Sequence, residues 1–279
     1  MFTPAETAAA AIPQPVQVMA LSRGITVNRE LYPDVALTIP SGFKRDPQRF
    51  LTVSIDGAER VRKEFFPADC DRNDCADIEL NFELALLQSG PVSLELLYNI
   101  GDVTSRNGSG LSAQSLGFRL AGNLSKTVGI AVGGESLVNL NPSSPCLDIN
   151  QACGQLKGRT LFAVASAAFP LSSRPNPPVI TVTAGAGNGY YGYNGSASDN
   201  QWGPIGSVSY AFNNRVSVGV EYSGYAISAG VSVRPLESFP LTASLFATDF
   251  LGNLPNNIEG SCGNQSCSLR VLGRVTYSF

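Results

Sequence analysis

The stretch Asp77–Leu86, which reads DIELNFELAL, decides the fold class. Its apolar residues occupy every second position, and Asp, Glu, Asn and Ala fill the positions between them. A helix cannot place these two sets on separate faces, whereas a strand puts one set on each face. The stretch therefore predicts a β-strand with one apolar and one mainly polar face.

The same alternation recurs along most of the chain. It weakens at two places: in 160–170, where Phe162 and Val164 compete with Leu161 and Ala163, and in 48–66, where Asp56–Gly57 could split the strand into a hairpin. The other alternating stretches are 92–100, 116–121, 128–133, 180–185, 207–212, 216–223, 225–234, 241–247 and 271–279. Counted with the two weaker stretches, they predict about 12 strands, with 10 to 14 possible.

The second face of these strands points to a closed barrel rather than a soluble sandwich. It carries mostly Ser, Thr, Gly and Ala, and only 15% of all residues are charged. Small polar residues suit a crowded or wet interior, and an unbroken apolar face suits lipid on the outside. The connections alternate between mostly long and short, which is typical of outer-membrane barrels. We therefore predict an all-β, closed antiparallel transmembrane β-barrel with both termini on the periplasmic side.

Composition excludes several other classes. The chain has 279 residues, no histidine and a net charge of −3. The lack of histidine removes Ser-His-Asp catalysis and histidine metal sites, so we expect no enzyme and no cofactor. The charge gives a nucleic-acid partner no support. No stretch of 18 apolar residues is present, which argues against transmembrane helices.

The six cysteines form three close pairs in polar, turn-rich stretches. An even count in tight pairs is typical of disulfides in an oxidising compartment, and a thiolate metal site is the weaker alternative. All three pairs fall in the longer connections, so we predict three disulfide-stapled outside loops. The predicted pairs are Cys70 with Cys75, Cys146 with Cys153, and Cys262 with Cys267.

The first 48 residues differ from the rest. They contain five prolines and little alternation. We interpret 1–48 as a periplasmic tail in preference to a plug that enters the lumen, and 49–279 as the barrel. Residues 1–20 have neither a basic start nor a long enough apolar run to be a complete signal peptide.

The chain ends in LGRVTYSF, where Val275, Tyr277 and Phe279 alternate up to a terminal aromatic residue. This ending resembles the C-terminal assembly signal of Gram-negative outer-membrane β-barrel proteins. The resemblance implies a porin-like barrel in the outer membrane, with the lipid bilayer and the barrel-assembly machinery as partners. It identifies no particular member and no oligomeric state.

The charged residues predicted to face inward suggest a function. A polar lumen with an acidic bias predicts a narrow passive diffusion channel for small solutes or ions, mildly favouring cations. An ion-pair network that seals the lumen is the alternative, and it would leave a non-conducting structural or surface-recognition barrel. A barrel hydrolase and a secreted β-sandwich are weaker alternatives. The predicted lumen-lining set is Glu79, Glu83, Glu95, Arg119, Glu135, Glu221 and Arg274.

Two further groups have ordinary interpretations. The loop 67–77 begins with the spacing of a calcium loop but lacks its glycine and terminal glutamate, so we expect a solvated acidic loop and no metal. The aromatic residues are interpreted mainly as membrane-interface girdles, with surface recognition as the alternative for the outside cluster. The outside cluster is Tyr190, Tyr191, Tyr193 and Trp202, and the periplasmic set is Phe169, Phe212, Phe239, Tyr277 and Phe279.

Overall fold

The structure is a computed structural model of the chain. It describes residues 16–60, 77–101, 103, 113–140, 159–192, 201–224, 226–248, 250 and 270–279. All three cysteine pairs, and with them the disulfide prediction, lie outside these residues. So does most of the acidic loop at 67–77.

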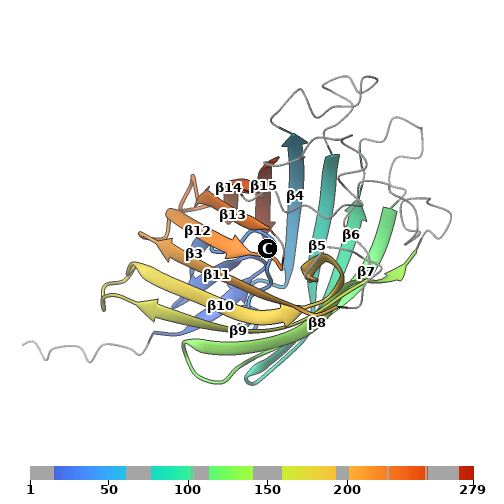
Figure 1. The fold of residues 1–279 in the computed structure, drawn as a ribbon. Helices are drawn as coiled ribbons and strands as arrows, with labels where there is room; N and C mark the ends of the chain where they lie inside the picture. The colour runs from blue at the N-terminus through green and yellow to red at the C-terminus, as the bar shows by residue number, and fades with distance from the viewer. Residues whose placement is uncertain are drawn as a thin grey trace, which may run out of the picture.

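Among the described residues, twelve antiparallel strands form a closed barrel (Figure 1). They are β4 (Leu51–Arg60), β5 (Asp77–Ser89), β6 (Val92–Gly101), β7 (Ala113–Asn123), β8 (Val128–Asn139), β9 (Thr160–Pro170), β10 (Val179–Gly187), β11 (Gly203–Ala211), β12 (Val216–Tyr222), β13 (Ile227–Val233), β14 (Leu241–Thr248) and β15 (Arg270–Ser278). The barrel class and the strand number expected from the alternation are confirmed.

The barrel closes where its first and last strands meet. β15 pairs with β4 from Arg270 opposite Arg60 to Ser278 opposite Thr52. The Phe279 backbone N–H donates to the Leu51 carbonyl at 2.8 Å, so the chain ends at the rim where the first barrel strand begins. Asp56–Gly57 does not split β4, because Arg274 and Gly273 of β15 continue the pairing opposite these residues.

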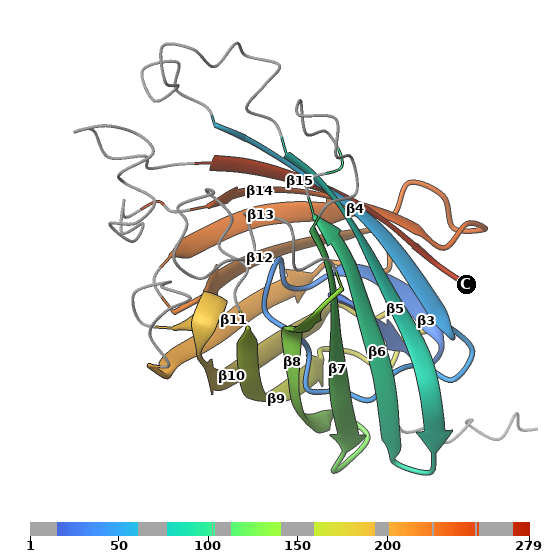
Figure 2. The same ribbon diagram turned by 90° about the vertical axis from the view of Figure 1, so that its right-hand side faces the viewer.

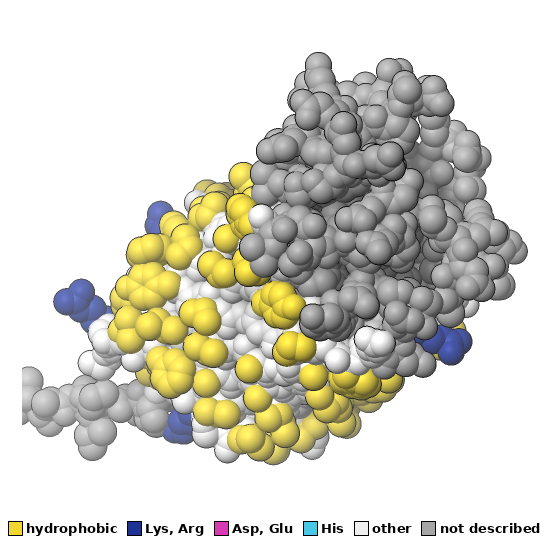
Figure 3. Space-filling model, viewed as in Figure 1, with side chains coloured by type: hydrophobic (Ala, Val, Ile, Leu, Met, Phe, Trp, Pro, Cys, Tyr) yellow, Lys and Arg dark blue, Asp and Glu magenta, His cyan; other side chains and the backbone are white. Residues whose placement is uncertain are grey.

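The outer surface of the barrel is apolar. Large side chains such as Val208 and Leu245, each 55% exposed, stand on the outer face of the strands. Figure 3 shows one side of the molecule, where hydrophobic side chains cover the barrel and Lys and Arg lie at its margins. A closed sheet leaves no unpaired backbone edge, and an apolar outer belt is the surface that lipid requires.

The ambiguous stretch 160–170 forms the single strand β9. Phe162 and Val164 point inward and are buried, while Leu161 is exposed on the outside. The inward pair packs with Ile39 and Tyr191, which explains why the sequence showed two competing sets of apolar residues. At this wall the interior is partly apolar.

The interior of the barrel is occupied by the chain's own N-terminal segment, residues 16–50, here called the inner segment (Figure 2). It contains a three-stranded antiparallel sheet of β1 (Val18–Leu21), β2 (Gly24–Val27) and β3 (Glu30–Asp34). A stretch without regular strands, which contains Phe43 and Arg45, then leads to β4. Within the described residues, no helix is long and apolar enough to cross a membrane.

The preference for a periplasmic tail was therefore wrong for residues 16–48. Val18, Ile25, Tyr32 and Phe43 are fully buried and form a cluster with Ala168, Val179 and Ala211 of the barrel wall. The apolar residues of the segment stand in short consecutive runs, such as Val18–Leu21, in which all four residues are buried, so they show little alternation. They pack on one another and on wall residues such as Ala168, Val179 and Ala211, which lie more than 100 residues further along the chain.

Candidate functional site

The candidate site is the interface between the inner segment and the inner face of the barrel. The seven residues predicted to line the lumen stand on six strands, β5 to β8, β12 and β15. Six of them contact residues of the inner segment, as described below. Glu79 is half-buried and lies opposite Asp56 in the pairing of β4 with β5.

Glu95 is the centre of the most buried charge cluster. It is fully buried and lies between two guanidinium groups. Arg45 of the inner segment approaches it at 3.1 Å, and Arg119 of β7 forms a second ion pair with it. Glu83 of β5 adds a carboxylate 3.5 Å from Arg45. A buried charge without a partner is costly, so this arrangement ties the segment to three neighbouring strands.

Arg119 also binds the backbone of the inner segment. Its guanidinium donates to the Ser41 carbonyl at 2.8 Å and to the Phe43 carbonyl. Beside it, Gly42 donates its backbone N–H to the Ser166 hydroxyl on β9 at 2.8 Å. Backbone polar groups of the stretch between β3 and β4, which has no regular strand, are thus satisfied by the wall, as buried backbone groups require.

On the opposite wall, Glu221 of β12 holds a turn of the inner segment. It accepts the Leu37 backbone N–H at 2.8 Å and the Thr38 hydroxyl at 2.6 Å. The carbonyl of Leu37 accepts a hydrogen bond from Arg274 of β15 at 2.5 Å, and Arg274 also pairs with Asp56 of β4. A carboxylate and a guanidinium from the wall therefore clamp one residue of the segment from both sides.

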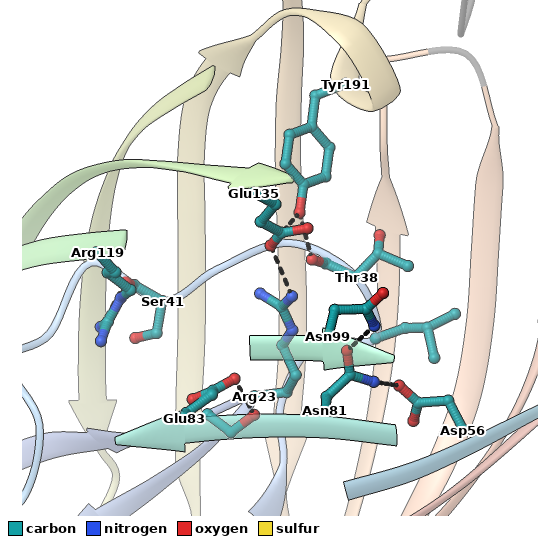
Figure 4. A network of polar contacts seen from close by, with 12 residues as sticks. Arg23, Thr38, Ser41, Asp56, Asn81, Glu83, Asn99, Arg119, Glu135 and Tyr191 are labelled. Atoms are coloured by element: carbon teal, nitrogen blue, oxygen red, sulfur yellow. Dashed lines mark hydrogen bonds and ion pairs between the residues drawn. The ribbon is translucent and has the colours of Figure 1, made fainter. Parts of the chain in front are cut away.

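A third group of polar contacts lies around Arg23, in the turn between β1 and β2 (Figure 4). Arg23 pairs with Glu135 of β8 at 3.1 Å. The Tyr191 hydroxyl donates to the Thr38 carbonyl at 2.7 Å and lies 3.3 Å from Glu135. Figure 4 also shows Asn99, Asn81 and Asp56 in a row, joined by hydrogen bonds of 2.5 and 2.7 Å.

Tyr191 corrects one aromatic assignment. It was interpreted mainly as part of a membrane-interface girdle, but it is fully buried in the short helix η3 (Gly189–Tyr191) and packs edge-on against Phe162. Trp202, Phe169, Phe212, Phe239 and Phe279 are all exposed, as a girdle requires. Tyr193 and the side chain of Tyr190 lie outside the described parts of the chain.

Two carboxyl groups of β3 show how the segment is held electrostatically. Burial raises the pKa of the Asp34 carboxyl above its ordinary value, although nearby Arg274 and a hydrogen bond from Ser244 act against burial. For Glu30, burial acts in the same direction, but hydrogen bonds from Arg234 and Asn214 lower its pKa overall. Glu30 is thus stabilised as an anion, whereas the surroundings of Asp34 disfavour its ionised form.

The sequence located the wall side of the site but missed the segment side. Arg23, Asp34 and Arg45 of the segment were not predicted as site residues, and neither was Asp56 of the wall strand β4. One available signal was the basic character of residues 16–50, which hold five of the 19 Lys and Arg residues of the chain. The segment has more basic than acidic residues and faces a wall with more carboxylates than guanidiniums, so the two surfaces are complementary.

No group of three or more His, Cys, Asp and Glu residues that could hold a metal ion occurs in the described part of the chain. The wall carboxylates are spread over several strands, and most are paired with the segment. Within the described residues, the site is an interface between two parts of one chain.

Fold and site together define a class, a transmembrane β-barrel of the outer-membrane type with its N-terminal segment inside the lumen. No protein-family model and no curated protein matches the sequence. Among solved structures, the chain is similar to the outer membrane protein Omp33 of Acinetobacter baumannii, with a TM-score of 0.41 and 7% identity. The likeness covers 83% of this chain and 98% of that one. The class is therefore assigned from the barrel's own closure, apolar belt and filled lumen.

Proposed function

We propose that the protein is an outer-membrane channel that its own inner segment closes at rest. The observation that carries this proposal is the fully buried Glu95 between Arg45 and Arg119. In a permanently open channel, the same carboxylate would face water, and the basic residues of the segment would have no such partners. When the segment is displaced, the lumen becomes a narrow path for small solutes or ions.

The opened lumen would mildly favour cations. The described wall carries Asp56, Glu79, Glu83, Glu95, Glu135 and Glu221 against Arg119, Arg234 and Arg274. Arg23 and Arg45 neutralise part of this acidic set while the segment is in place. Their departure would leave carboxylates facing water, which attract cations into a narrow pore. The residues predicted from the sequence to line a channel would then act as its lining.

A non-conducting barrel is the second candidate. It is favoured by the extent to which the segment and the wall satisfy each other, including the clamp that Glu221 and Arg274 form on Leu37. In this alternative the inner segment is a permanent core, and the barrel has a structural or surface role.

Conductance across planar bilayers separates the two candidates. The wild-type chain is compared with Glu95→Gln, which removes the charge between two buried guanidiniums, and with Glu221→Gln on the opposite wall. Glu237→Gln is the matched control, because Glu237 pairs with Arg215 of a neighbouring turn and both side chains are exposed. We expect rare openings for the wild type and the control, and frequent cation-favouring openings for both lumen variants.

Heat-modifiable gel mobility shows which variants have folded, since a folded barrel runs differently from the unfolded chain. If folded Glu95→Gln and Glu221→Gln both remain silent, the channel proposal fails and the non-conducting barrel stands. If the wild type conducts as strongly as the variants, the lumen is open at rest and closure by the segment is wrong.

A further inference from the structure

Behind the inner segment, the barrel wall carries buried hydroxyl groups that the docked segment leaves unsatisfied. Thr181, Ser209, Thr242 and Thr276 are each at most 4% exposed, and their hydroxyls have no hydrogen-bond partner among the described residues. They stand as two cross-strand pairs. Thr181 lies opposite Ser209 on β10 and β11, and Thr242 lies opposite Thr276 on β14 and β15.

These hydroxyls alternate with positions where the wall does bind the segment. Next along the inner face of β14, Ser244 donates to Asp34 at 2.8 Å. On either side of Thr276 on β15, Arg274 binds the Leu37 carbonyl and Ser278 accepts from Arg49. Next to the other pair on β10 and β11, Val179 and Ala211 pack on the inner segment, so both pairs lie within the docking interface.

A buried hydroxyl without a partner costs free energy, and the same group in contact with water does not. If the lumen were sealed permanently, apolar residues of the same shape would make the same contacts without that cost. When water replaces the segment, the same hydroxyls hydrogen-bond to water and the cost is removed. The two pairs thus weaken the closed state and leave the open state unaffected.

We propose that these two hydroxyl pairs act as a built-in bias toward opening, which makes the docking of the inner segment reversible. The inference rests on the proposed closure of the channel by the segment and adds its regulation. Partnered hydroxyls on the same wall have the opposite role. Ser166, which is hydrogen-bonded to both the Gly42 N–H and Thr183, strengthens the closed state.

The test replaces hydroxyls by apolar groups of similar shape. Replacing unsatisfied and satisfied hydroxyls should change the open fraction in opposite directions. Thr181→Val with Thr276→Val removes one unsatisfied hydroxyl from each pair, and Ser166→Ala removes a satisfied one. All variants are made in the Glu95→Gln background, where openings are expected to be frequent. We expect the double replacement to lower the open fraction roughly tenfold, and Ser166→Ala to raise it, from the usual cost of an unsatisfied buried group.

Cleavage of the inner segment by a protease in detergent provides a readout independent of conduction. The double replacement should slow cleavage and Ser166→Ala should speed it, with heat-modifiable mobility confirming folded barrels. If both changes act in the same direction, or the double replacement has no effect on cleavage, the proposed bias is overturned. If no variant conducts, but the double replacement slows cleavage and Ser166→Ala speeds it, the channel proposal fails and the bias on segment docking stands.

Discussion

At the scale of single residues, one close approach between segment and wall depends on two glycines. Gly42 and Gly129 meet backbone to backbone. A Cβ on Gly129 would stand 2.7 Å from the Gly42 carbonyl oxygen and 2.7 Å from the Phe43 Cα. Both neighbours are backbone atoms, which cannot turn away as a flexible side chain can. The segment can therefore lie against β8 only if this wall position has no side chain.

Gly129→Ala should loosen the inner segment while leaving the barrel folded. The added methyl group overpacks the interface, and such insertions typically cost about 1–3 kcal/mol. Faster protease cleavage of the segment in detergent is the expected result. Gly273→Ala on β15 is the matched control, because a Cβ there meets nothing within 4 Å. Equal cleavage rates for the two variants would contradict the close packing at Gly129.

The wall charges could be predicted from the sequence because each stands on a strand of period 2, where neighbours fix the direction of the side chain. Glu95 and Arg119, for example, lie opposite each other in the pairing of β6 with β7. Arg45 could not be placed in this way, since it belongs to no named strand and its direction is set by the contacts themselves.

At the scale of elements, β3 is the strand of the inner segment that lies on β12, β13 and β14. Asp34 at its end donates its backbone N–H to Ser232 at 3.1 Å, accepts at its carbonyl from Ser217 at 2.6 Å, and accepts at its carboxyl from Ser244. Hydroxyls from three barrel strands thus converge on one residue. Because its carboxyl is buried, the docked β3 holds a proton more tightly than the free chain does.

This gives the docking of β3 a defined pH dependence. The pKa of Asp34 is raised in the folded state, so the stability that its proton contributes is fully present below the ordinary Asp pKa of about 3.9. That stability falls as the pH rises from there through the raised folded-state pKa. Asp34→Asn should remove this part of the decline. The measurement is the unfolding midpoint in detergent from pH 3 upward, and an unchanged pH profile for Asp34→Asn would contradict the assignment.

At the scale of the whole molecule, the barrel separates an apolar outside from a polar and segment-filled inside. This separation explains why exposed Val208 and Leu245 coexist with fully buried Glu95. A soluble protein shows the reverse arrangement. The outer face is therefore adapted to lipid, and the inner face to a segment of the same chain.

Charge on the outer face should act according to its depth in the bilayer. Val208→Arg places a charge on the lipid side near the middle of β11 and should destabilise the barrel by about 2–4 kcal/mol in vesicles. Leu236→Arg is the matched control, because Leu236 is equally exposed, at 56%, but lies in a short turn at the rim. Urea unfolding in lipid vesicles measures both variants, and equal losses would argue against a membrane at the level of Val208.

The sequence by itself determined the barrel. Alternation with period 2 fixes which face of each strand meets lipid, and this information is local because successive strand residues always point to opposite sides. Only the tertiary structure decided what fills the lumen. The partners of the inner segment lie up to 237 residues away in the sequence, as for Leu37 and Arg274. Because the segment has little periodicity, its neighbouring residues do not indicate which side chains contact the wall.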